Sequence, residues 1–438
     1  MNFVILLRMS NRRIQGLPIP LIKKKSHLNV IFLHPDLGIG GAERLVVDAA
    51  LSLKFNGHDV RFLTSHHDKN HCFKETRDGT LNVWVQGAWI PRHFCSFFHA
   101  FFAYIRSLYT VVFLLFYSKW KFDLIFADQI SAPLFLLKKF SRAKIIFYCH
   151  FPDQLLVQKT GFLRSLYRKP LNLFEEYTTG LADCVVVNSN FTAETFRKTF
   201  KSLDNIYLEV LHPCVSSALL KWTDRNEING EKLKNISSNL KPNYFLSLNR
   251  FERKKNIALA IRAIGLLKNQ LCNEDFDNIH LVIAGGYDSV NKENIVHFDE
   301  LKMLVEKLNL ESYVTFFKSP SDDQKACLLM NCFSLIYTPS FEHFGIVPVE
   351  AMLCRKPVIA VNNGGLLETV VNNQTGVLVD AEPEHFARAM KRLLLEPNLV
   401  SKFGEAGRNR ALRHFTTDIF AEKLNALCIG VCCGATRG

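Results

Sequence analysis

The sequence lacks several patterns that would mark a fold or a site. Its 12 cysteines form no C-x-x-C pair, which argues against a zinc site of ordinary spacing. No glycine-rich run matches either G-x-G-x-x-G or the Walker A loop. The apolar run at residues 3–7 is too short for a signal-peptide core, and basic residues follow it instead of preceding it. We therefore expect no secretion, buried reduced thiols such as Cys149 and Cys184, and a cytosol-facing location.

Acidic residues are scarce in two segments, which together hold the whole net charge of +13. Residues 1–25 contain six basic residues and no acidic one, and residues 138–170 contain eight basic residues against one acidic residue. Such an excess fits nucleic acid, a phosphate-bearing substrate or an anionic membrane surface. Because neither segment contains a recognised nucleic-acid-reading module, we expect no nucleic-acid partner. The first segment is either a basic arm without regular structure or a tether to a membrane surface.

Phenylalanine is abundant, with 36 residues, and seven of them lie at 93–118 around a single formal charge, Arg106. A membrane-spanning helix needs about 20 apolar residues. Arg106 would then lie near mid-span, at a cost of roughly 2.5–3.5 kcal/mol. Three interpretations stay open for this segment: a spanning helix, an amphipathic helix in one leaflet, or a helix buried in the protein. The first two imply contact with a membrane.

Short apolar runs alternate with helix-like segments along the chain, which predicts βαβ units and parallel sheets. The fold class is therefore α/β, with two Rossmann-like parallel-sheet domains facing a cleft. We place these domains at residues 28–214 and 242–415, with a linker at 215–241, a basic arm at 1–27 and a C-terminal helix or tail at 416–438. The expected strands are 30–33, 60–64, 81–85, 124–127, 145–149, 184–187, 244–248, 280–284, 314–317, 334–337, 358–361 and 376–379.

Two motifs follow expected strands of the first domain. Gly40 and Gly41 lie in a turn between a strand and a helix, where glycine allows close backbone approach and the helix N-terminus offers free N–H groups. A tight turn with no ligand explains the same spacing. His150 leaves a buried strand at its carboxyl end, where ligands bind in such folds. From the sequence alone, a structural histidine fits this position as well as a functional one.

The second domain carries basic and acidic residues after its expected strands. Arg250 and Lys255 could bind a diphosphate through a planar fork and a point charge, although a solvated face is the ordinary meaning of such a charge run. Glu342 and Glu350 stand eight positions apart, and carboxylates can accept hydrogen bonds from sugar hydroxyls. A turn near a bound nucleotide is expected at Gly285 and Gly286, and Gly345 is a further candidate substrate-binding residue. A further turn at 362–365 precedes Glu368.

Together these motifs resemble those of the retaining glycosyltransferases of family 4, which have the GT-B fold. Glu342 and Glu350 match the E-x7-E signature, and Arg250 and Lys255 match the R-x4-K signature. Longer runs are similar to the eukaryotic α-1,3/1,6-mannosyltransferases of dolichol-linked oligosaccharide assembly, over about residues 28–415. These runs are HPDLGIGGAERLVVDAA, FYCHFPD, EEYTTGLADCVVVNS, NRFERKKN and PSFEHFGIVPVEAM.

The resemblance implies an enzyme that moves mannose from GDP-mannose to a mannosyl-chitobiosyl diphosphodolichol and then to its product. It implies the membrane of the endoplasmic reticulum, on the cytosolic face, as the location. No metal and no cofactor beyond the donor substrate are implied, and other mannosyltransferases of the pathway are candidate partners. Carried over by motif, Arg250 and Lys255 would hold the donor diphosphate, Glu342 the mannose hydroxyls and Glu350 the ribose. His150 would contact the sugar near the reacting carbon, and Gly40 and Gly41 would let substrate meet the backbone.

The sequence departs from the family at both ends. Its basic N-terminal arm is unusually long, and its C-terminal tail is short, which leaves domain bracing by that tail in doubt. Two alternatives stay open: another GT-B retaining glycosyltransferase with a different lipid acceptor, and a catalytically silent scaffold on the same fold. The intact set of Arg250, Lys255, Glu342 and Glu350 argues against the scaffold.

Overall fold

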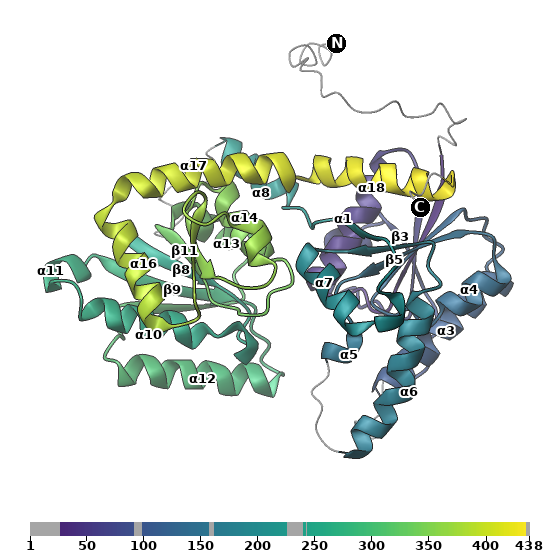
Figure 1. Cartoon of the computed structure of the whole chain (residues 1–438), viewed down its shortest axis with the longest axis horizontal. Coiled ribbons are helices and arrows are strands. Elements are labelled where there is room, and N and C mark those ends of the chain that lie inside the picture. The colour runs from purple at the N-terminus through teal and green to yellow at the C-terminus, as the bar shows by residue number, and fades with distance from the viewer. Residues whose placement is uncertain (1–26, 92–98, 157–161, 226–239, 242, 435–438) are drawn as a thin grey trace, which may run out of the picture.

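The computed structural model describes residues 27–91, 99–156, 162–225, 240–241 and 243–434. Within these residues the chain forms two parallel β-sheets, one in each half (Figure 1). The first sheet has seven strands in the order β3-β2-β1-β4-β5-β6-β7. Its strands are β1 (Asn29–His34), β2 (Asp59–Thr64), β3 (Asn82–Val85), β4 (Leu124–Asp128), β5 (Lys144–Cys149), β6 (Cys184–Val187) and β7 (Leu208–Val210).

The second sheet has six strands in the order β10-β9-β8-β11-β12-β13. Its strands are β8 (Asn243–Leu248), β9 (Ile279–Gly285), β10 (Val314–Lys318), β11 (Ser334–Tyr337), β12 (Val358–Val361) and β13 (Gly376–Val379). The predicted fold class is confirmed, and each of the twelve predicted strands is present, with ends within one residue of those expected. The short β7 was missed because its three residues alternate in polarity and resemble a loop.

Helices cover both faces of each sheet, which is why the strands are continuous apolar runs. Alternate residues of β1 show this, because Val30 and Phe32 belong to one core cluster and Ile31 and Leu33 to another. Helices of the first half are α1 (Gly41–Phe55), α2 (Lys74–Arg77), α3 (His99–Phe116), α4 (Leu134–Phe140), α5 (Asp153–Leu156), α6 (Phe162–Thr179), α7 (Asn190–Thr199) and η1 (Lys201–Leu203). The remaining helices are α8 (Ser217–Arg225), η2 (Arg253–Lys255), α10 (Ile257–Lys268), α11 (Asn273–Phe276), α12 (Lys292–Lys307), α13 (Asp322–Asn331), α14 (Ile346–Leu353), α15 (Leu366–Thr369), α16 (Pro383–Leu395), α17 (Pro397–His414) and α18 (Thr417–Cys432).

Helix α3 forms most of the phenylalanine-rich segment and packs against the first sheet. Val111 and Leu114 are buried in a core cluster that includes residues of β1, β2 and β4. Arg106 is buried as well, and its guanidinium donates a hydrogen bond to the backbone oxygen of Ser65 at 2.7 Å. The charge that weighs against a spanning helix is thus accommodated inside the protein. Among the described residues, no helix is long and apolar enough to cross a bilayer.

The segment predicted as a linker begins with a helix. Leu219 of α8 lies in the core cluster of the second half, so this part of the chain packs on the second sheet. Its polar sequence concealed the helix because only one face is buried. Residues 226–239 of the same predicted linker lie outside the described residues, as does residue 242, the first of the predicted second domain. The basic arm at 1–26, residues 92–98 and 157–161, and the end of the tail at 435–438 also lie outside them.

The C-terminal helix returns to the first half of the chain. Helix α17 packs on α14 of the second half, and α18 then lies along α1 (Figure 1). Phe420, Leu424, Cys428 and Val431 recur at helical spacing and join the core cluster of β1 and α1. Asn425 accepts a hydrogen bond from the ring of His58 at 2.7 Å. The tail is therefore long enough to brace one domain against the other.

Candidate active site

Two of the predicted site residues, His150 and Glu342, lie beside a contact between the two halves of the chain. Parallel strands in such sheets carry ligands at their carboxyl ends, beside the point where the strand order reverses. Loops after β5 and β11 contact each other there, because the rings of Phe151 and His343 stack with centroids 3.9 Å apart and planes at 5°. These residues directly follow His150 and Glu342. The sequence prediction of a site shared by the two domains is consistent with this contact.

Lys255 and Glu342 form the central ion pair of the site. The Lys255 Nζ lies 2.7 Å from Glu342 Oε2, and the hydroxyl of Tyr337 donates to the same oxygen at 2.8 Å. Burial would raise the pKa of Glu342, but the charge of Lys255 and these two hydrogen bonds outweigh it and hold the pKa below its ordinary value. Glu342 is therefore an ionised acceptor at neutral pH, and its Oε1 is not engaged by either donor.

Arg250 lies beside this pair and is far more exposed. Its guanidinium side chain is 61% exposed and contacts Glu252 at 3.1 Å. Gly285, at the end of β9, lies close to the loop that carries Arg250, and a Cβ at this position would lie 1.9 Å from the backbone oxygen of Asn249. A Cβ on Gly286 would lie 3.3 Å from Cγ of Arg250. These two glycines thus let the loop after β9 pack against the Arg250 loop.

Glu350 is buried in α14 and is held by Lys325 of α13. The Lys325 Nζ donates to Glu350 Oε1 at 2.7 Å. The other oxygen, Oε2, is buried and has no hydrogen-bond partner among the described residues. Helix α14 begins at Ile346, two residues before Pro348, and Gly345 precedes it with a left-handed φ of 85°. That conformation favours glycine, so Gly345 sets the turn that leads from Glu342 into α14.

Gly40 and Gly41 start α1 without a side-chain cap. A Cβ on Gly40 would lie 2.2 Å from Glu43 Oε2, whereas a Cβ on Gly41 would meet nothing within 4 Å. Free space therefore surrounds Gly41 at the helix N-terminus, where N–H groups remain available to an anion or a hydroxyl. Glu43 turns back toward His34, and its Oε1 lies 3.8 Å from His34 Nε2.

His150 belongs to a buried network that the sequence did not reveal. Asp128 ends β4 and accepts a hydrogen bond from His150 Nε2 at 2.9 Å and from His34 Nδ1 at 2.8 Å. Burial alone would lower the pKa of His34, but the Asp128 carboxylate outweighs it and raises the pKa to about 10. Because Asp128 holds Nε2 of His150, the other ring nitrogen is the one available to substrate.

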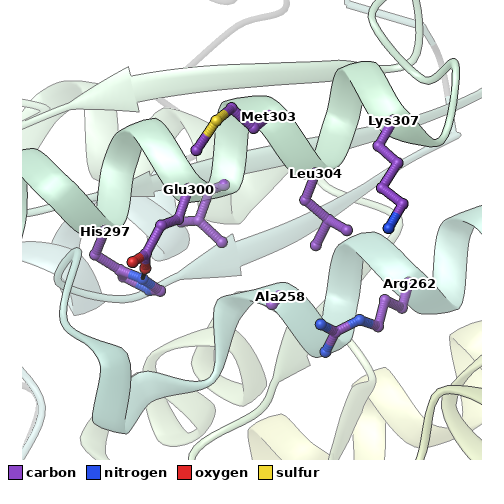
Figure 2. A pocket seen from close by; sticks show the side chains of 8 residues that line it. Ala258, Arg262, His297, Glu300, Met303, Leu304 and Lys307 are labelled. Carbon is purple, nitrogen blue, oxygen red and sulfur yellow. Dashed lines mark hydrogen bonds and ion pairs between the residues drawn. The ribbon is translucent and has the colours of Figure 1, made fainter.

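The sequence analysis thus named the basic pair, the acidic pair and His150, but it missed four residues that hold these side chains. Tyr337 and Lys325 fix the two glutamates, while His34 and Asp128 hold His150 in place. A signal was present, since His34 and Asp128 are polar residues that directly follow expected strands at 30–33 and 124–127. A separate pocket of about 320 Å³ lies between α10 and α12 (Figure 2). It is lined by Arg262, His297 and Glu300 among others and contains none of the predicted site residues.

Comparison with known proteins identifies the fold and the family of the chain. Residues 39–218 match the model for Glycosyltransferase Family 4, and residues 229–410 match the model for Glycosyl transferases group 1. Among solved structures, the sucrose-phosphate synthase of Thermosynechococcus elongatus superimposes with a TM-score of 0.72 at 20% identity, covering 91% of this chain and 98% of that one. WaaG, a glycosyltransferase of lipopolysaccharide biosynthesis, superimposes with a TM-score of 0.67 at 18% identity, covering 92% and 100%. Fold and family models together define a GT-B glycosyltransferase.

Curated relatives narrow this class. The α-1,3/1,6-mannosyltransferase ALG2 of Homo sapiens is 46% identical over 400 residues, which cover 90% of this chain and 94% of that protein. The enzyme of the same name from Saccharomyces cerevisiae is 42% identical over 432 residues, covering 91% and 84%. The chain belongs to this family of α-1,3/1,6-mannosyltransferases, and the predicted resemblance is confirmed.

Proposed function

We propose that the protein transfers mannose from GDP-mannose to a mannosyl-chitobiosyl diphosphodolichol and then to the resulting dimannosyl product. The two additions form the α-1,3 and α-1,6 linkages that the names of its relatives state. The observation that carries this proposal is the partly buried Lys255–Glu342–Tyr337 cluster beside Arg250. It combines fixed positive charge for a diphosphate with an ionised acceptor for sugar hydroxyls.

The donor diphosphate would bind Arg250 and Lys255. An ammonium group has three donors, and Glu342 occupies one of those on Lys255, so two remain for phosphate oxygens. The exposed guanidinium of Arg250 is free to move from Glu252 to a more highly charged partner. As the bond between C1 of mannose and the diphosphate breaks, negative charge grows on the leaving group. Both cations would stabilise that charge without a metal or a further cofactor.

The sugar and the nucleoside would bind the two glutamates. Glu342 Oε1 would accept a hydrogen bond from a mannose hydroxyl, because both internal donors contact Oε2. The carboxylate of Glu350, held by Lys325, would accept a hydrogen bond from a ribose hydroxyl. His150 would contact the mannose from the opposite domain. Transfer with retention places the acceptor oxygen on the same face of C1 as the leaving group, and the acceptor proton then passes to the departing diphosphate.

The acceptor lipid requires a membrane, and we propose the cytosolic face of the endoplasmic reticulum, where other mannosyltransferases of the pathway are candidate partners. Exposed aromatic residues of the first half support this. Six of them are more than 40% exposed, and the rings of two, Phe116 and Phe140, lie with centroids 5.7 Å apart; the six are Trp84, Trp89, Phe101, Phe116, Tyr117 and Phe140. Lys138, Lys139 and Arg142 flank Phe140 in the sequence. Aromatic side chains beside basic ones suit an anionic lipid interface.

Incubation with labelled sugar nucleotides tests this function directly. Purified protein in liposomes should transfer label from GDP-mannose, and not from GDP-glucose or UDP-glucose, to a synthetic lipid-linked trisaccharide. Transfer from GDP-mannose to a different lipid acceptor alone would favour the alternative glycosyltransferase. No transfer to any dolichol-linked acceptor, with intact folding shown by circular dichroism, would favour the silent scaffold.

A further inference from the structure

The turn at residues 362–365 lies directly behind the Glu342 loop. The backbone N–H of Gly365 donates a hydrogen bond to the backbone carbonyl oxygen of Glu342 at 2.8 Å. A Cβ on Gly365 would lie 2.2 Å from the backbone oxygen of His343, and one on Gly364 would lie 2.6 Å from that of Glu342. These glycines therefore allow the turn to support the loop that carries Glu342. Glu368, in the α15 helix that follows, extends from this support toward the first domain.

Glu368 binds the beginning of α7 in the other domain. Its Oε1 accepts from the backbone N–H of Phe191 at 2.8 Å, and its Oε2 accepts from the backbone N–H of Asn190 at 2.9 Å. The amide of Asn190 donates to Oε2 at 2.8 Å, and the ring of His212 lies 3.1 Å from the same oxygen. The first N–H groups of a helix have no partner within it and carry partial positive charge. Glu368 thus completes a helix of one domain from the other.

These contacts shape the ionisation of Glu368. Burial would raise its pKa, but the hydrogen bond with His212 and those from Asn190 and Phe191 outweigh burial and hold the pKa below its ordinary value. The carboxylate is therefore charged at neutral pH, and its hydrogen bonds to the first domain are charge-assisted.

A second contact joins the start of α7 to the loop that carries Glu342. Ser189, the N-cap of α7, donates its hydroxyl to the backbone oxygen of His343 at 2.6 Å. The neighbouring Asn188 donates its amide to the backbone oxygen of His150 at 3.0 Å. A continuous chain of hydrogen bonds and peptide links therefore joins His150 on one domain to Glu342 on the other. The stacked rings of Phe151 and His343 follow the same path.

We propose that Glu368 is a positioning residue, which holds the second domain on the first so that His150 and Glu342 face the same substrate carbon. This inference rests on the proposed function for its catalytic consequence, but the contact itself is a property of the two domains. Glu368 touches neither the basic pair nor Glu350. Its loss should therefore separate the domains while leaving the donor residues in place.

Glu368→Ala tests the proposal against Glu405→Ala, a matched removal of a surface glutamate whose ion pair with Arg355 stays within the second domain. Small-angle scattering should show a larger radius of gyration for Glu368→Ala alone. Amide exchange in the peptide that begins α7 should accelerate in that variant alone. The value of kcat/KM should fall roughly 10- to 100-fold, on the scale of losing charge-assisted hydrogen bonds. The dissociation constant of GDP-mannose should change far less than kcat/KM.

Wild-type domain spacing and amide exchange in Glu368→Ala would overturn the proposal. Altered spacing with unchanged turnover would overturn its catalytic part. Where Glu368→Ala does not fold, Glu368→Gln keeps the shape and one acceptor oxygen, and it should give smaller changes of the same sign; unchanged spacing in that variant would also overturn the proposal. Failure of the proposed function would instead appear as absent mannosyl transfer in the wild type, while scattering and exchange would still distinguish the variants.

Discussion

Replacing Lys255 by alanine is the change that most directly perturbs the central ion pair. Lys255 and Glu342 have side chains only 16% and 18% exposed, and their charged atoms lie 2.7 Å apart. Loss of the ammonium removes one of two cations available to the leaving diphosphate. It also leaves Glu342 in a buried position without its main counter-charge, so the pKa of this carboxyl should rise.

The expected magnitude follows from the role of the cation. Removing one fixed donor that faces developing negative charge lowers kcat by roughly 10²- to 10³-fold, or about 3–4 kcal/mol. Because the substitution also perturbs Glu342, we expect kcat to fall by at least the upper end of that range. The fold should persist, because the pair is at the domain interface and the sheet cores do not depend on it.

Steady-state transfer of labelled mannose to the lipid-linked acceptor measures this effect, with thermal unfolding as the check on folding. Lys254→Ala is the matched control, since Lys254 is the neighbouring lysine, is 68% exposed and contacts Glu252 instead of Glu342. The control should keep kcat within about twofold, as expected for an exposed ion pair. Equal kcat values for Lys255→Ala and Lys254→Ala would refute the assignment of Lys255 to the leaving group.

Three further predictions concern other parts of the molecule. Lys325→Ala should raise the KM for GDP-mannose roughly tenfold with a smaller change in kcat, because Glu350 loses the ammonium group that contacts it at 2.7 Å. Equal KM values for Lys325→Ala and the wild type would contradict this. His34→Gln should lower the free energy of unfolding by about 3 kcal/mol near pH 6, and denaturant titrations should show a smaller loss toward pH 10. The stability from a raised pKa is complete below the ordinary 6.5 and is lost as pH rises through about 10, so a pH-independent loss would argue against the His34–Asp128 pair. Charge reversal at Lys138, Lys139 and Arg142 of the first domain should weaken binding to anionic vesicles, measured by co-sedimentation, by about 1 kcal/mol or more per residue. Charge reversal at Lys292, Lys302 and Lys307 of α12 is the control and should leave this binding unchanged.

Most of the fold was predictable because its strands are buried on both faces. Runs such as Ile145–Cys149 are apolar over their whole length, and the helices between them have the ordinary 3.6-residue period. The two pairs of charged residues in the candidate site were predictable because each lies within one short motif. Glu342 and Glu350, for example, are joined by a single turn at Gly345 and the first residues of α14.

The remaining features depend on contacts between distant segments. The contact among His34, Asp128 and His150 forms because β4 lies between β1 and β5 in the sheet. No local sequence pattern predicts this strand order. The contact of Glu368 with α7 likewise needs the relative position of two domains. Helix α18 was treated as an uncertain tail because its apolar residues find their partners more than 350 positions earlier, on α1.

Linkage analysis of the product tests the central claim most directly. Wild-type protein should be incubated with GDP-mannose and the lipid-linked trisaccharide, and the released oligosaccharide should be analysed by methylation and by linkage-specific mannosidases. We predict two added mannoses, one α-1,3 and one α-1,6, on the same branch-point mannose, and neither with Lys255→Ala. A product with any other linkage, or label that stays in GDP-mannose with the folded wild-type protein, would contradict the account.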